Sequence, residues 1–168
     1  VDMPSALLYA MHDPKYNWKY YTEPEPYLNN RSLYCPRGKM IGGCSSHNGM
    51  VFARGHKEDF DRWSSTGLTN WSYEKVLPYF KKLETWSQNG NDRGKNGPLR
   101  VNKSKIDKKY PLFKKVLDAT KEAGYKIFND SNNINNEGFG TFDVTINKGV
   151  RQSVAKAYLE PIQSRKNL

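Results

Sequence analysis

The chain has 168 residues, 36% of them hydrophobic and 13% aromatic, which is enough for a packed core and excludes a disordered tail. The net charge is +10, but Lys and Arg are spread along the chain and no nucleic-acid-binding motif occurs, so no nucleic-acid partner is expected. Two cysteines cannot build a disulfide framework, and no apolar run approaches the roughly 20 residues of a membrane helix.

The first 36 residues are predicted to be ordered but irregular. They are rich in Tyr and Asn, and prolines interrupt any regular element at Pro14, Pro24, Pro26 and Pro36. The opening residues, VDMPSALLYAMHD, lack the basic start and the cleavage-like end of a signal peptide, and they lack an initiating methionine. We therefore expect a protein that is not secreted, and a chain that is an internal piece of it.

Residues 38–50, GKMIGGCSSHNGM, are small and carry no charge after Lys39. The pair Gly42 and Gly43, followed by small polar residues, allows the backbone to approach a flat or anionic ligand. The pattern is neither GxGxxG nor a P-loop, so the residues alone leave open a cofactor site and a plain tight turn. The apolar residues 50–52 that follow could begin a short helix or form a buried extended segment.

Two amphipathic helices are predicted next. Residues 57–63 carry early acidic residues and should form a short helix that stops near Gly67. Ser72 is the predicted N-cap of a longer helix, in which Pro78 should lie near the first turns or cause a kink. The apolar face of this helix consists of Val76, Leu77, Phe80 and Leu83.

The remaining elements alternate between strand and helix. A loop over residues 89–99 leads to a strand at 99–101, and a strand at 141–146 is followed by a turn and by a helix that begins at Ser153. Between these strands, a helix should begin at Pro111 and stop at Gly124. Its predicted buried stripe is Leu112, Val116, Ala119 and Ala123, with Phe113 and Leu117 beside it.

The stretch RGKMIGGCSSHNGMVFARGHKEDFDRW, followed by WSYEKVLPYFKKLE, closely resembles the first signature region of the glucose-methanol-choline (GMC) oxidoreductases, FAD enzymes that oxidise alcohols. Further blocks in the same order are similar to the choline dehydrogenase branch of this family: YNWKYYTEPEP, NNRSLYCPRGK, GPLRV, EAGY, EGFG and AYLEPIQSRKNL. The resemblance covers nearly the entire chain.

The resemblance implies a mixed α+β or α/β fold, namely part of a GMC-type FAD-binding fold with part of the substrate cap domain. Residues 1–63 would be the flavin-facing part of the FAD-binding domain, with the signature loop at 37–52. Residues 64–150 would belong to the cap, and 151–168 would return to the FAD-binding domain. The fold would be incomplete, because the strand, GxGxxG and helix that bind the FAD pyrophosphate are absent, as is the catalytic histidine found toward the family's C-terminus.

The resemblance also implies which residues contact the flavin, and no catalytic residue is expected within this chain. The matching positions are Gly42, Gly43, Cys44, His47, Asn48, Gly49 and Val51, with Cys44 and Val51 contacting through the backbone. Cys44 and His47 depart from the general family pattern and resemble the choline oxidase type of this loop, in which the matching histidine is bonded to the flavin 8α-methyl group.

FAD bound covalently through His47 and FAD bound without a covalent bond both remain open. An imidazole nitrogen is a good nucleophile near neutral pH, and its attachment would raise the flavin's tendency to accept hydride. A metal site is not expected, because Cys44 and His47, with the distant Cys35 and His12, lack the spacing of a closed four-ligand site.

Other conspicuous residues have plainer explanations. His56 is expected to be a surface histidine. Arg151 and Ser153 match a recurring family block, although a helix cap explains Ser153 equally well. Packing of an extended segment is favoured over a cage for a quaternary ammonium ion at Trp18, Tyr20 and Tyr21.

The function implied by the resemblance is oxidation of a small alcohol, choline, to betaine aldehyde, with hydride transfer to flavin N5 and electrons passing to a quinone-linked acceptor or to oxygen. The isolated piece should bind FAD weakly or not at all, because the pyrophosphate site is missing, and it should be inactive. Alternatives are another primary alcohol or a sugar as substrate, or a non-catalytic structural module similar to the cap. The expected location is a bacterial cytoplasm or inner membrane, with peripheral membrane association, or a mitochondrion.

Overall fold

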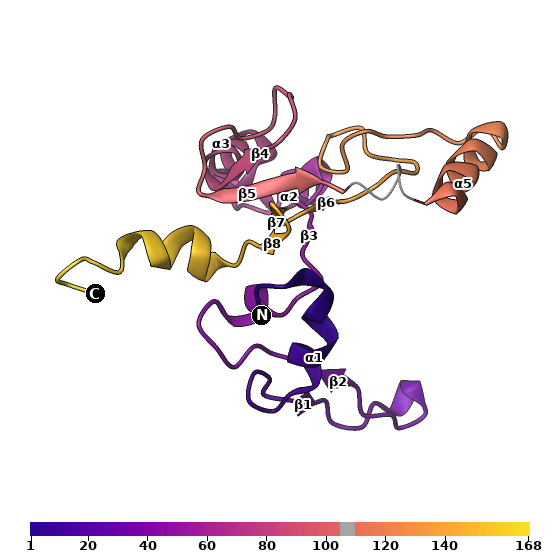
Figure 1. Ribbon diagram of the computed structural model, residues 1–168. Helices are drawn as coiled ribbons and strands as arrows, with labels where there is room; N and C mark the ends of the chain where they lie inside the picture. Colours follow the sequence, from indigo (N-terminus) through magenta and orange to yellow (C-terminus); the bar gives the residue numbers. More distant parts are fainter. Residues whose placement is uncertain (105–109) are drawn as a thin grey trace. The chain divides into compact units, whose positions relative to one another are not determined.

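The computed structural model describes residues 1–104 and 110–168, which form two compact units (Figure 1). The first unit comprises Val1–Met50 and Ile146–Leu168, and the second comprises Val51–Thr145. Both units mix helix and sheet, as predicted. Their boundaries do not coincide with those that the resemblance gave for a flavin-facing part and a cap, and these roles remain predictions.

The first 36 residues hold more regular structure than the prolines suggested. Helix α1 ends before Pro14, where the proline rule allows a helix to stop, and two short strands pair antiparallel with Tyr20 opposite Cys35. The elements of this segment are η1 (Pro4–Ala6), α1 (Leu7–His12), β1 (Tyr20–Tyr21), η2 (Pro26–Leu28) and β2 (Tyr34–Cys35).

The C-terminal part of the first unit begins with the hairpin of β7 (Ile146–Asn147) and β8 (Val150–Arg151). Lys148 and Gly149 both have positive φ, +50° and +79°, as a two-residue hairpin turn requires, so the predicted turn is confirmed.

The helix expected from Ser153 is helical but is not a regular α-helix. It consists of the π-helical turn η5 (Ala155–Leu159) and the 3-10 turn η6 (Glu160–Ile162). Pro161 has no N–H to donate to the carbonyl of Ala157, so an α-helical hydrogen bond cannot form there.

The second unit is built on a four-stranded sheet with the order β3-β6-β5-β4. The β4 and β5 strands are parallel, whereas the β5–β6 and β3–β6 pairs are antiparallel. Leu99 and Val101 alternate with exposed Arg100 on β5, which gives the period of two of a half-buried strand. The strands are β3 (Val51–Phe52), β4 (Glu84–Trp86), β5 (Leu99–Lys103) and β6 (Asp143–Val144).

This sheet decides two expectations about strands and adds one strand that was not expected. Residues 51 and 52 are extended, which decides the question that periodicity left open. The single strand predicted at 141–146 is wrong, because β6 and β7 belong to different sheets in different units. The β4 strand was not predicted, since its residues follow directly on a helical pattern.

Helices α2 (Lys57–Ser65) and α3 (Tyr73–Leu83), joined through η4 (Thr69–Trp71), match the predicted helices. Gly67 has a φ of +107° beyond the end of α2. Ser72 occupies the N-cap position of α3 without a side-chain cap bond, and Asp61 Oδ1 accepts the N–H of Tyr73 at 3.0 Å instead.

Helix α5 (Pro111–Glu122) has the predicted start and stop, and Gly124 has a φ of +83°. The predicted buried stripe is wrong, because Leu112 is 74% exposed and Val116 is 47% exposed. The inward side is the neighbouring stripe of Phe113, Leu117 and Thr120. Since both stripes carry apolar residues at helical spacing, periodicity could not choose between them.

Candidate functional site

The small-residue loop turns at the glycine pair in the first unit. Gly42 has a φ of +87°, and a Cβ there would lie 2.4 Å from Ser46 Oγ and 3.2 Å from the Cβ of Ala155. Gly43, with a φ of +53°, begins the 3-10 turn η3 (Gly43–Ser46). A side chain at Gly42 would therefore meet both an unfavourable backbone conformation and a steric clash.

The backbone of the loop is uncrowded at Gly43 and at Gly49. Among the residues that the structure describes, nothing lies within 4 Å of a Cβ built on Gly43 or on Gly49. Cys44 and Asn48 are exposed on the same short stretch. The loop thus offers uncovered backbone, which is what a flat ligand needs for close approach.

His47 is buried, with 3% of its surface exposed. Its backbone N–H donates to Cys44 O at 3.1 Å, whereas Nδ1 and Nε2 have no hydrogen-bond partner within residues 1–104 and 110–168. An unpartnered buried polar group costs about 1–3 kcal/mol, and such groups are rare enough to require an explanation. A group that contacts or bonds to the imidazole would provide one.

The two ends of the Asn48 side-chain amide differ: its oxygen is fixed by hydrogen bonds, whereas its NH₂ group is not. Its Oδ1 accepts from Arg151 Nη1 and from the N–H of Met50, each at 3.0 Å. Its Nδ2 donates no hydrogen bond within the described part of the chain, and the side chain is exposed. The amide is therefore held at one end and available as a donor at the other.

The structure brings six of the seven predicted flavin-contacting residues together in the first unit. Val51 is the exception, because it begins the second unit, where it lies opposite Val144 between β3 and β6. The open backbone, the unpartnered imidazole and the free amide donor fit a flat conjugated ring with hydrogen-bonding edges, such as the isoalloxazine of FAD.

Ser45 is a functional candidate that the sequence reasoning missed. Arg151 is a candidate that it noticed as part of a family block but left without a role. Ser45 Oγ donates to Gly42 O at 2.6 Å and accepts the N–H of Val154 at 2.9 Å, which ties the loop to the start of η5. Arg151 donates to the same loop from β8. Only the small polar character of position 45 was visible in the sequence, since these partners lie more than 100 residues away.

His56 and Ser153 have structural roles. His56 Nδ1 accepts the N–H of Glu58 at 3.3 Å at the start of α2, and Nε2 lies 3.1 Å from Ile134 O, to which it donates. This helix cap was not predicted, and it leaves His56 half-buried where a surface histidine was expected. Ser153 Oγ accepts the N–H of Lys156 at 3.3 Å, which favours the cap explanation.

The aromatic residues near the N-terminus do not form a cage. Trp18 and Tyr20 stack with ring centroids 6.2 Å apart and an interplanar angle of 7°. Lys39 Nζ lies 4.7 Å from the centroid of Trp18, so the chain's own cation already uses this ring. Trp18 and Tyr21 remain half exposed or more, at 50% and 66%.

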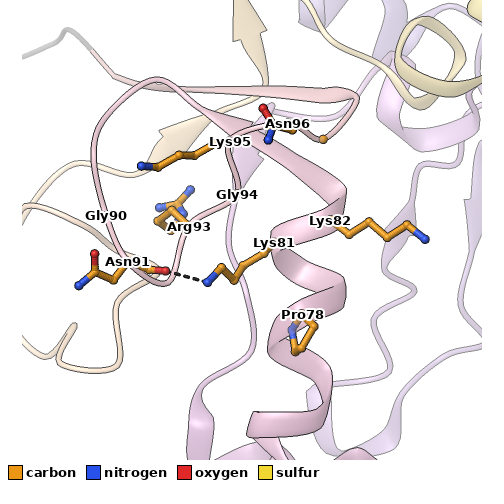
Figure 2. A pocket seen from close by; sticks show the side chains of 10 residues that line it. Pro78, Lys81, Lys82, Gly90, Asn91, Arg93, Gly94, Lys95 and Asn96 are labelled. Carbon is orange, nitrogen blue, oxygen red and sulfur yellow. Dashed lines mark hydrogen bonds between the residues drawn. The ribbon is translucent and has the colours of Figure 1, made fainter.

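A cavity of about 590 Å³ lies in the second unit, between α3 and the loop that joins β4 to β5 (Figure 2). Lys81 points across it and donates to Asn91 O at 2.8 Å, whereas Lys82 extends away from the loop. The lining contains no histidine, cysteine or carboxylate, so its lysines are the only side chains there of a type used for acid-base or nucleophilic chemistry. The lining residues are Pro78, Lys81, Lys82, Gly90, Asn91, Arg93, Gly94, Lys95, Asn96 and Gly97.

Within the described residues, no group of three or more His, Cys, Asp or Glu side chains could hold a metal ion. In that same part of the chain, none of the helices has the length and apolar character required to cross a membrane.

Comparison with known proteins gives a family and several close relatives. The family model described as GMC oxidoreductase matches residues 6–168. Oxygen-dependent choline dehydrogenase from Sinorhizobium fredii (strain NBRC 101917 / NGR234) is 49% identical over 170 residues, which cover 100% of this chain and 30% of the relative. The enzyme of the same name from Rhizobium etli (strain CIAT 652) is 48% identical, with the same coverage.

Solved structures share the fold. Pyridoxine 4-oxidase from Mesorbium loti superposes with a TM-score of 0.90 at 29% identity, over 99% of this chain and 33% of the other. An FAD-dependent oxidoreductase from Chaetomium thermophilum gives a TM-score of 0.80 at 26% identity, over 93% and 29%. The chain therefore spans about a third or less of the proteins that it matches.

Proposed function

Because the chain belongs to the GMC oxidoreductase family, we propose that the protein carrying it is an FAD-dependent oxidoreductase that oxidises choline to betaine aldehyde. The observation that carries this proposal is the 48–49% identity, across the whole chain, to relatives named oxygen-dependent choline dehydrogenase. Their name favours oxygen over a quinone-linked electron acceptor. The chain spans 30% of these relatives, so the activity belongs to the whole protein.

FAD is the cofactor that the family and the structural neighbours support. The residues proposed to hold its isoalloxazine are Gly42, Gly43, Cys44, His47, Asn48, Gly49 and Val51. When bound, FAD would supply the hydride acceptor for alcohol oxidation. The loop would contribute uncovered backbone at the glycines and the free amide donor of Asn48.

His47 is proposed as the covalent tether of the flavin. One feature supports this: neither ring nitrogen of His47 has a hydrogen-bond partner among the described residues. An imidazole nitrogen that accepts no hydrogen bond keeps its lone pair for a bond to another group. The flavin bond would give this nitrogen the partner that the protein does not supply.

Acid precipitation of the full-length holoprotein tests the tether. The yellow colour should stay with the pellet of the wild-type protein and appear in the supernatant for His47→Ala. His12→Ala is the matched control, because His12 is exposed and lies outside the loop. If the wild-type colour washes away, the covalent bond is refuted while the family assignment stands.

Anaerobic mixing with candidate alcohols tests the substrate. Choline should bleach the visible flavin absorbance of the full-length protein, and equimolar betaine aldehyde should be formed. Pyridoxine is the informative competitor, because the neighbour with a TM-score of 0.90 is a pyridoxine 4-oxidase. Bleaching by pyridoxine or a sugar and not by choline would replace the proposed substrate while keeping the reaction type.

The relatives named above are bacterial, which favours a bacterial cytoplasm or inner membrane over a mitochondrion as the location. Peripheral association with a membrane remains part of the proposal. Fractionation of cells that express the full-length protein would place it, and complete release by low salt would argue against membrane association.

A further inference from the structure

Arg151 lies on β8 with 1% of its surface exposed, and its side chain is directed to the backbone of the signature loop. Its Nη1 donates to Asn48 O at 2.8 Å, to Asn48 Oδ1 at 3.0 Å and to Ser45 O at 3.3 Å. Its Nε donates to Val1 O at 3.1 Å. One nitrogen, Nη1, therefore donates to two residues of the loop, and Nε donates to the first residue of the chain.

The acceptors of this guanidinium are neutral. No carboxylate lies within ion-pairing distance of Arg151 in the part of the chain that the structure describes. Burial lowers the pKa of Arg151, and the charge of Asp2 opposes this shift, but a guanidinium stays protonated in proteins. A buried cation is costly to desolvate, so hydrogen bonds to loop carbonyls are the main compensation that this one receives.

These hydrogen bonds fix the loop beyond the two residues that they touch. Asn48 Oδ1 receives both Arg151 Nη1 and the N–H of Met50, and Met50 has a φ of +59°, which is unfavourable for a residue with a side chain. The bridge through Asn48 thus holds a strained turn near the end of the loop. His47 lies between Ser45 and Asn48, the two residues whose carbonyls Arg151 holds.

We infer that Arg151 is the positioning residue of the signature loop: its Nη1 holds Ser45, Asn48 and, through Asn48, Met50, while its Nε is fixed on Val1 O, so that His47 and the Asn48 amide are presented to the flavin. This inference rests on the proposed function for its last step. Geometry matters as much as charge, because a lysine ammonium on a flexible stem cannot replace both Nη1, which donates to the loop, and Nε, which donates to Val1 O.

Two variants of the full-length protein test the inference: Arg151→Gln, which removes the charge, and Arg151→Lys, which keeps it. Amide hydrogen exchange of residues 45–50 should accelerate by about tenfold or more in both, since each loses charge-assisted hydrogen bonds. The ratio of bound flavin to protein should fall in both. Arg165→Gln is the matched control, because Arg165 is an exposed arginine of the same unit, and it should leave both readouts unchanged.

The outcomes separate the inference from the function on which it rests. Unchanged exchange in Arg151→Gln, or wild-type exchange and flavin content in Arg151→Lys, would overturn the positioning role. Faster exchange with unchanged flavin content would support the role of Arg151 in holding the loop, but it would refute the assignment of this loop to the flavin. If the Arg151 variants do not fold, Asn48→Ala removes the Oδ1 bridge together with the side-chain amide, and a wild-type exchange rate at Met50 in the flavin-free protein would then count against the inference.

Discussion

The guanidinium of Arg93 and the carboxylate of Glu84 meet in a two-point contact, with Nε 2.7 Å from Oε1 and Nη2 3.0 Å from Oε2. Both side chains are buried. Arg93 Nη1 also bonds to Asp130 at 2.6 Å and to Asp143 at 2.7 Å. Arg93 lies in the loop that joins β4 to β5. Its bonds therefore connect this loop to β4, to β6 and to the segment before β6.

Removal of this guanidinium should be strongly destabilising. Arg93→Ala leaves buried carboxylates without their cation, and the expected loss is about 3–5 kcal/mol in the free energy of unfolding. Urea unfolding of the protein and the variant measures it. Arg62→Ala is the control, because the Arg62–Asp59 pair is exposed and should be worth about 1 kcal/mol or less. Similar losses in the two variants would contradict the assigned role of the network.

Helices α2, α3 and α5 were predictable because each carries local signals. Ser72, Gly67 and Gly124 mark starts and stops that the structure keeps. The β4 strand was not predictable in this way, because Glu84 reads as the polar end of a helix. Its burial depends on Arg93 and Arg54, which come 9 residues later and 30 residues earlier in the chain.

The same distinction applies to the candidate site. The resemblance to the GMC family could be recognised in the sequence because the loop residues are contiguous. The match over residues 6–168 confirms it. Arg151 could be noticed as part of a family block, but its partner Asn48 is 103 residues away, and only the folded chain brings them together. The roles of the loop residues toward the flavin remain predictions.

Gly42→Ala should disturb the loop more than Gly49→Ala. The first places a Cβ 2.4 Å from Ser46 Oγ at a φ of +87°, so we expect a loss of about 1–3 kcal/mol in stability and a lower flavin content. The second meets nothing within 4 Å among the described residues, so stability should change by about 0.5 kcal/mol or less. Thermal unfolding and flavin absorbance report the two effects. Equal destabilisation would show that Gly42 is not under the constraint assigned here.

His47→Leu should separate flavin attachment from stability. The substitution removes two buried nitrogens that lack partners in the described residues, so the flavin-free protein should be as stable as the wild type or more stable by up to about 1–3 kcal/mol. The flavin content should fall at the same time. Urea unfolding of protein from riboflavin-depleted cells gives the first quantity, and absorbance of normally grown protein gives the second. A clear destabilisation of the flavin-free form would mean that the imidazole has a structural partner.

The link between α2 and α3 through Asp61 predicts a pH dependence. A side-chain hydrogen bond from Lys57 and the backbone N–H of Tyr73 lower the pKa of Asp61 from its ordinary 3.8. Since the pKa is lower in the folded state, this stabilisation is fully present above pH 3.8 and is lost as the pH falls through the lowered pKa. Urea midpoints measured from about pH 6 down to about pH 2 should fall less steeply in Asp61→Asn than in the wild type. Asp118→Asn, which alters an exposed pair with Lys114, is the control and should keep the wild-type slope. Parallel curves for the wild type and Asp61→Asn would show that Asp61 does not couple protonation to the stability of this helix pair.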